Sequence, residues 1–202
     1  MSEIIEKLSA LFARFPGIGP RQAGRFVHFL LHTSPAFRRE LSLAIANLAK
    51  NVRQCGSCQR FHDDETPLCR QCRDTQREPA TLMIVASDTD IAAVEHAGAY
   101  RGYYFVLGGT IPLSSERDVH VREAQMKRTV LERLKNGLAE VVLALPANPE
   151  GDATAAFVHE VLEPIAKDHK LTISMLGRGL STGSELEYAD PDTIKNALKN
   201  RS

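Results

Sequence analysis

Four cysteines form the clearest chemical signature of this 202-residue sequence. Cys55 and Cys58 make one Cys-x2-Cys pair, Cys69 and Cys72 make a second, and ten residues lie between the pairs. Four thiolates spaced in this way can occupy the corners of a tetrahedron around Zn²⁺, and a shell closed by four protein ligands leaves no position for a substrate. The spacing therefore predicts one structural zinc ion per chain.

Two redox-active dithiols, as in a thiol oxidoreductase, are the alternative interpretation of the same cysteines. Such motifs usually lie between a strand and a helix, and residues 54–79 are polar and show no such pattern. These residues are also too poor in apolar side chains to form a core, which a bound metal can replace. His62 lies between the pairs and could replace a cysteine, but we expect a surface residue because four thiolates are available.

A glycine hairpin precedes the cysteines and is the second candidate site. Gly17 and Gly19 lie in Phe-Pro-Gly-Ile-Gly-Pro between two amphipathic stretches, where glycine permits a tight turn and close approach of a partner. The following helix begins with free backbone N–H groups, which bind anions, and Arg21 and Arg25 share one of its faces. We therefore expect a helix-hairpin-helix in which Gly17, Gly19, Arg21 and Arg25 bind DNA phosphates without reading base sequence.

Basic side chains are concentrated in the first part of the chain, although the formal net charge is zero. Residues 1–80 hold 12 Lys and Arg against 8 Asp and Glu, and the stretch 14–39 holds five arginines and no acid. A local basic patch favours nucleic-acid binding more than the overall charge does. An ordinary helical hairpin with solvated arginines fits the charge equally well. His28 and His32 are expected at the surface, because no carboxylate lies nearby to complete a metal site.

The remaining pattern places these sites on four segments of a mixed α/β chain. Residues 1–53 predict amphipathic helices, and residues 54–79 form the metal-binding segment. In residues 80–177 apolar runs alternate with helical patterns, which predicts a mainly parallel sheet with helices on both faces. The runs are 82–86, 103–107, 141–145 and 171–176, and the helical patterns lie near 88–97, 121–136 and 152–168. In residues 178–202, Asp190 and Pro191 are typical of a helix start, which predicts a short helical tail.

Three further motifs lie in the last two segments. They are Leu107-Gly108-Gly109, then Glu150-Gly151-Asp152-Ala153-Thr154-Ala155, then Gly183-x-Glu185-Leu186-Glu187-Tyr188-Ala189-Asp190. Together with the hairpin and the cysteines, this order closely resembles the RecR family of bacterial recombination mediators across nearly the whole chain. The α/β half resembles a Toprim domain, the fold shared with primases and topoisomerases.

The resemblance implies a DNA-binding mediator of recombinational DNA repair. Such proteins act with RecO and RecF to load RecA at gapped or single-stranded DNA, and they assemble as homodimers or ring-like homotetramers. It also implies a helix-hairpin-helix domain in 1–53, a C4 zinc finger in 54–79, a Toprim domain in 80–177 and an assembly tail in 178–202. The family's basic DNA-contacting pair falls on Arg21, where lysine is usual, and on Arg25, which matches.

The acidic positions depart from the Toprim pattern. A catalytic Toprim domain uses a glutamate after its first strand and an Asp-x-Asp pair that holds Mg²⁺. Those positions fall here on Ala86, Pro146 and Asn148, and of the acidic set Glu150 and Asp152 remain. We expect no catalytic residue and no enzymatic activity, with Glu150 and Asp152 forming a weak Mg²⁺ site or a partner contact. The alternative is a Mg²⁺-dependent Toprim nuclease or topoisomerase-like enzyme.

Four further acids, Asp88, Asp90, Glu185 and Glu187, lie outside the Toprim acidic set. Asp88 and Asp90 near a predicted helix start suit capping better than metal binding. Glu185 and Glu187 fit either a solvated strand edge or an assembly contact.

No apolar run approaches the length of about 20 residues that a membrane span needs, and the first residues do not form a secretory signal. We therefore expect a cytoplasmic, nucleoid-associated protein with no membrane partner.

Overall fold

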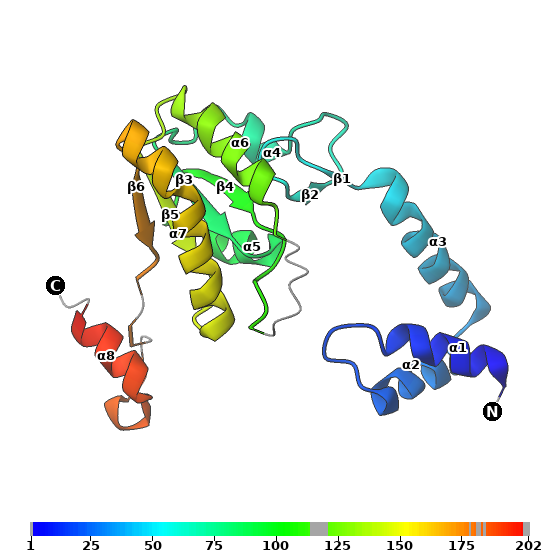
Figure 1. Cartoon of the computed structure of the whole chain (residues 1–202). Helices are drawn as coiled ribbons and strands as arrows, with labels where there is room; N and C mark the ends of the chain where they lie inside the picture. The colour runs from blue at the N-terminus through cyan, green and yellow to red at the C-terminus, as the bar shows by residue number, and fades with distance from the viewer. Residues whose placement is uncertain (1, 114–120, 178, 181–182, 184, 200–202) are drawn as a thin grey trace. The chain divides into compact units, whose positions relative to one another are not determined.

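The chain folds as two compact units, residues 1–52 and residues 53–202 (Figure 1). The computed structural model describes residues 2–113, 121–177, 179–180, 183 and 185–199. Each unit has its own architecture, the first purely helical and the second mixed α/β. This composition agrees with the fold class predicted from the sequence.

The first unit is a helical hairpin followed by a third helix. Helix α1 spans Glu3–Phe12, α2 spans Pro20–His32 and α3 spans Pro35–Asn51. Helices α1 and α2 pack against each other, and the ring of Phe12 makes edge contacts with Phe15 and Phe26 at centroid distances of 5.7 Å. These aromatic contacts therefore stabilise the turn between the two helices.

The second unit is built on a parallel sheet in the order β4-β3-β5-β6. Its strands are β3 (Thr81–Val85), β4 (Tyr103–Val106), β5 (Glu140–Ala144) and β6 (Thr172–Met175). Leu82 of the central strand β3 is in register with Tyr103 on one side and with Val141 on the other. Every pairing in this sheet is parallel, as the alternating sequence pattern predicted.

Helices cover both faces of the sheet and create two apolar cores (Figure 1). Leu82 and Ile84 of β3 enter the larger core with α6 (Glu123–Leu134) and α7 (Pro149–His169). Met83 and Val85, which point to the opposite face, enter the smaller core with Ile91 of α5 (Asp88–Ala97). Because a parallel sheet is buried on both faces, its central strand is apolar at successive positions rather than alternating.

The cysteine segment and the C-terminal tail contribute short elements to the same unit. Strands β1 (Arg53–Gln54) and β2 (Phe61–His62) pair antiparallel, and α4 spans Arg70–Arg73. In the tail, the 3-10 turn η1 (Leu186–Tyr188) precedes α8 (Pro191–Lys199). Asp190 caps α8 by accepting a hydrogen bond from the Thr193 N–H, as the sequence predicted. Residues 178, 181–182, 184 and 200–202 of the predicted tail lie outside the described residues.

In the part of the chain that the structure describes, no helix combines the length and the apolar character needed to cross a membrane.

A polar network joins the residues after the cysteines to the sheet. The guanidinium of Arg77 donates to Glu95 at 2.6 Å and to the Gly102 carbonyl at 2.9 Å, and it lies over the Tyr104 ring. The Tyr104 hydroxyl donates to the other oxygen of Glu95 at 2.6 Å. Desolvation opposes ionisation of Glu95, but the hydrogen bonds from Arg77 and Tyr104 prevail and lower its pKa. Half-buried charges that are paired in this way hold α5 against the chain that precedes β3.

Helix α7 begins three residues earlier than predicted, because the loop after β5 turns back onto it. Asn148 caps the helix, with its side-chain oxygen accepting from the Gly151 N–H at 2.8 Å, and Pro149 occupies the first turn. The Pro146 carbonyl lies so close to Gly151 that a Cβ there would overlap it. Glycine in the Glu-Gly-Asp motif is therefore required by this close approach of backbone to backbone.

Gly151→Ala is expected to lower the free energy of unfolding of the second unit by about 2–3 kcal/mol, because the added methyl group must displace the 146–149 loop. Gly56→Ala is the matched control, since a Cβ at Gly56 meets only ordinary contacts. The control should change stability by no more than about 0.5 kcal/mol. Urea denaturation of both variants measures the difference, and equal stabilities would contradict the close approach.

Candidate metal centre and nucleic-acid interface

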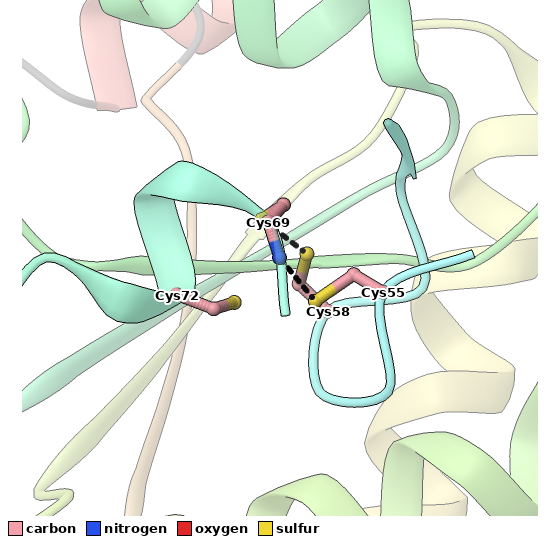
Figure 2. A group of neighbouring side chains, drawn as sticks. All are labelled: Cys55, Cys58, Cys69 and Cys72. Atoms are coloured by element: carbon pink, nitrogen blue, oxygen red, sulfur yellow. Dashed lines mark hydrogen bonds between the residues drawn. The ribbon is translucent and has the colours of Figure 1, made fainter. Parts of the chain in front are cut away.

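The sulphur atoms of Cys55, Cys58, Cys69 and Cys72 converge on one point in the second unit (Figure 2). All four lie within 4.8 Å of one another, and Cys58 Sγ lies 3.6 Å from Cys69 Sγ. Zinc–sulphur bonds of about 2.3 Å give Sγ–Sγ spacings of about 3.8 Å in a tetrahedron. All four cysteines are free of disulfides, three are buried and Cys72 is half-buried. The geometry fits a closed four-sulphur metal site.

The competition of the four thiols for protons also favours a bound metal ion. Hydrogen bonding with Cys58 lowers the pKa of the Cys55 thiol, whereas hydrogen bonding with Cys55 raises the pKa of the Cys58 thiol. The thiols therefore compete for shared protons, and they cannot all ionise at this spacing without a compensating cation. A divalent metal ion resolves the competition, because it binds all four as thiolates. The donor set suits a structural metal ion.

Two short turns present the sulphur atoms. In the first, the Cys55 N–H donates to the Arg60 carbonyl at 2.8 Å, and Gln59 adopts a φ of +62° that closes the loop. In the second, Cys69 is the N-cap of α4, which carries Cys72 one turn later. The Cys69 N–H also donates to Cys55 Sγ at 3.4 Å, a bond that joins the two turns. Each turn therefore needs a few residues and no apolar core.

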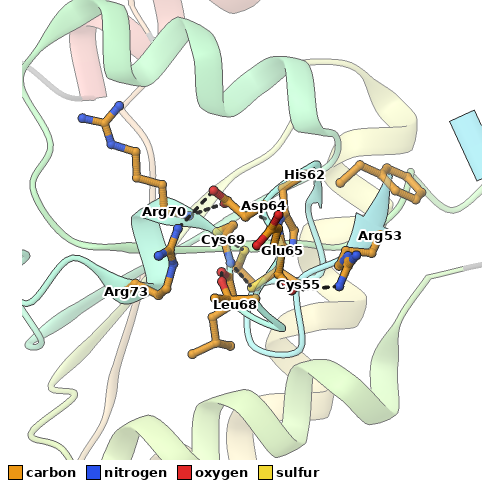
Figure 3. A network of polar contacts seen from close by, with 12 residues as sticks. Arg53, Cys55, His62, Asp64, Glu65, Leu68, Cys69, Arg70 and Arg73 are labelled. Carbon is orange, nitrogen blue, oxygen red and sulfur yellow. Dashed lines mark hydrogen bonds and ion pairs between the residues drawn. The ribbon is translucent and has the colours of Figure 1, made fainter. Parts of the chain in front are cut away.

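Asp64 organises the second turn from outside the sulphur cluster (Figure 3). Its carboxylate accepts from the Arg70 N–H at the start of α4 and from the Arg73 guanidinium, both at 3.0 Å. The same carboxylate lies 3.3 Å from His62 Nδ1. A carboxylate at a helix N-terminus is stabilised by the free N–H groups, so Asp64 holds the turn that positions Cys69 and Cys72.

His62 is buried, so its prediction as a surface residue was wrong. Side chains alternate along the two-residue strand β2, where Phe61 points outward and His62 points inward. The metal-binding group comprises the four cysteines and does not include His62. This geometry agrees with the prediction that the four cysteines, and not His62, are the metal ligands.

The first turn and the residues after it are bonded to the sheet and to the helices that cover it. The Cys58 carbonyl accepts from the Val106 N–H at 2.8 Å, so the turn covers the outer edge of β4. The Thr129 hydroxyl of α6 donates to the Ser57 carbonyl at 2.9 Å. Asp88 accepts from the Phe61 N–H at 2.8 Å, a role that differs from the helix capping predicted for it. Asp90 does cap α5, accepting from the Ser87 N–H at 2.8 Å.

The glycine hairpin of the first unit joins α1 to α2. Gly17 adopts a φ of +74°, which glycine accommodates without strain, and Gly19 is the N-cap of α2. No side chain caps α2, and Pro20 occupies its first turn, so the N–H groups of the next residues face outward. Arg21 and Arg25 are exposed one turn apart at this helix start. An uncapped helix start beside two exposed guanidinium groups can bind a phosphate.

The carboxyl edge of the sheet carries few acids. Ala86 is buried after β3, and Asn148 caps α7. Glu150 and Asp152 are exposed in the first turn of α7, where acidic side chains complement the helix dipole. Within the described ranges, the cysteines are the one group of three or more His, Cys, Asp or Glu residues whose ligand atoms converge.

Comparisons with known proteins agree over nearly the whole chain. Residues 80–177 match the family described as "Toprim domain", and residues 179–202 match the family described as "RecR, C-terminal". The chain is 36% identical over 193 residues to "Recombination protein RecR" of Desulfosudis oleivorans, covering 94% of this chain and 91% of that protein. It is 38% identical over 197 residues to the protein of that name from Cereibacter sphaeroides, covering 98% and 95%. A Streptomyces coelicolor protein of the same name is 34% identical over 202 residues, covering 98% and 96%. The chain therefore belongs to the RecR family of recombination proteins.

Proposed function

We propose that this protein is a non-catalytic, DNA-binding mediator of recombinational repair, which helps to load RecA at gapped DNA together with RecO and RecF. The observation that carries DNA binding is the uncapped start of α2 with Arg21 and Arg25 exposed beside it. The contacts are to phosphates, which suits a protein that must bind DNA of any sequence. The name of the relatives, "Recombination protein RecR", supports the recombination role.

The proposal excludes Mg²⁺-dependent phosphoryl chemistry at the carboxyl edge of the sheet. Such chemistry needs clustered carboxylates that hold the cations and stabilise developing charge. Ala86 and Asn148 supply no carboxylate, and Asn148 is engaged in capping α7. Glu150 and Asp152 lie on one turn of one helix and serve a partner contact or a single weakly held Mg²⁺ ion.

The metal of the four-cysteine site is Zn²⁺ in this proposal, with a structural role. Zinc favours four thiolates in a tetrahedron and has no redox chemistry of its own. The ion would be held by Cys55, Cys58, Cys69 and Cys72, and it would supply the cohesion that the segment lacks in apolar side chains. The hydrogen bonds from Val106 of β4 and Thr129 of α6 then connect the stabilised segment to the rest of the α/β unit.

We also propose that the protein works as a homodimer or a ring-like homotetramer. The first unit exposes large apolar side chains on α2 and α3, and no described side chain of α3 is buried. An apolar cavity of about 370 Å³ lies among its three helices. Exposed apolar surface of this kind is typical of protein–protein contacts. Assembly would place several α2 starts around one DNA molecule, which multiplies weak phosphate contacts.

The purified protein is expected to contain about one zinc ion per chain, and Cys58→Ser should lose most of it, because four ligands are needed to close the shell. Elemental analysis measures the metal, and limited proteolysis within residues 53–79 reports the resulting unfolding. His62→Gln is the control and should retain the metal. Full zinc content in Cys58→Ser would show that the cysteines are not the ligands.

Replacing both Arg21 and Arg25 with alanine is expected to weaken DNA binding and to flatten its salt dependence. Each lost phosphate contact removes roughly 0.7–0.9 from the slope of log affinity against log salt, so two remove about 1.4–1.8. Lys7→Ala with Lys50→Ala is the matched control, because it removes two exposed charges of the same unit that lie outside the basic stretch 14–39. Fluorescence anisotropy at several salt concentrations gives the slopes. If the two double variants behave alike, DNA binds elsewhere.

A further inference from the structure

Arg133 of α6 lies where this helix meets the metal-binding segment. Its Nη2 group donates to Ser57 Oγ at 3.2 Å and to Cys72 Sγ at 3.9 Å. Its guanidinium also stacks on the Tyr103 ring of β4, with Cζ 3.8 Å from the ring centroid. The three contacts come from three separate parts of the chain, so they fix the orientation of a side chain that would otherwise be flexible.

A divalent metal ion bound by four thiolates carries excess negative charge, which a neighbouring cation stabilises. Cys72 is the half-buried member of the four, and the other three cysteines are buried. A charge-assisted N–H···S bond lowers the energy of that thiolate and draws electron density away from the metal bond. Partners of this kind, which touch a ligand and not the metal, orient the ligand and tune the site.

We infer that Arg133 is a positioning residue of the metal centre, which holds the Cys72 thiolate and couples the centre to helix α6. The inference rests on the structural metal site proposed above and goes beyond its four ligands. Thr129, one turn earlier on α6, bonds the Ser57 carbonyl, so α6 contacts both cysteine turns at once. Loss of the metal therefore releases the C-terminal half of α6 from both turns, and loss of Arg133 loosens the metal.

The test uses the full-length protein loaded with Zn²⁺ or Co²⁺. Arg133→Ala is expected to transfer its zinc to a chromogenic chelator about 10–100-fold faster than the wild type, the usual effect of removing an outer partner. With Co²⁺, the thiolate-to-metal charge-transfer band should move to longer wavelength, because the thiolate loses a hydrogen bond. Arg133→Lys keeps the charge and should restore part of both effects.

Controls separate this role from a general loss of stability. Ser57→Ala removes the other acceptor of Arg133, and Lys135→Ala removes an exposed charge from the end of the same helix, so both should keep the wild-type band position. An unchanged band and an unchanged transfer rate in Arg133→Ala would overturn the inference. Where that variant does not fold, Arg133→Gln replaces it, and an unchanged band with an unchanged transfer rate in Arg133→Gln has the same meaning. A wild-type protein that binds neither metal would instead contradict the proposed site itself.

Discussion

Residues 53–79 depend on the convergence of four sulphur atoms at one point. The buried cluster of this segment consists of its cysteines, so the segment has no apolar core that could hold it without a metal. The same segment covers the outer edge of β4 through the bond from Val106 N–H to the Cys58 carbonyl. A free sheet edge can pair with other chains, and the cysteine turn covers this edge. A metal ion held by the four cysteines would therefore stabilise the α/β unit as well as its own turns.

At the carboxyl edge of the sheet, hydrogen bonds and close packing hold the start of α7 in place. Gly151 and Asn148 maintain the tight start of α7, and the buried Thr154 hydroxyl accepts from the Ile111 N–H at 2.8 Å. The Thr154 bond ties the loop after β4 to α7, and it joins a backbone N–H group to a side-chain oxygen without a metal ion. DNA binding, in this account, belongs to the separate helical unit. The α/β unit then provides a rigid framework and a surface for partners.

Local patterns in the sequence were sufficient to predict the longer helices, the four strands of the parallel sheet and the cysteine cluster, because each depends on residues a few positions apart. The caps formed by Asp90 and Asp190 are of this kind. Contacts between distant parts of the chain could not be predicted. Asp88 bonds Phe61 27 residues away, and Arg133 reaches Cys72 across 61 residues. The burial of His62 follows from a two-residue strand that is too short to show any alternation in the sequence.

The central claim, DNA binding without catalysis, is tested most directly by a titration of the purified protein on labelled gapped DNA with and without Mg²⁺. One gel reads both the mobility of the complex and the length of the DNA. The account predicts a shifted band with intact DNA under both conditions, because the sheet edge lacks the carboxylates of two-metal chemistry. Fragments that appear with Mg²⁺ would contradict it, since Glu150 and Asp152 would then suffice for cleavage.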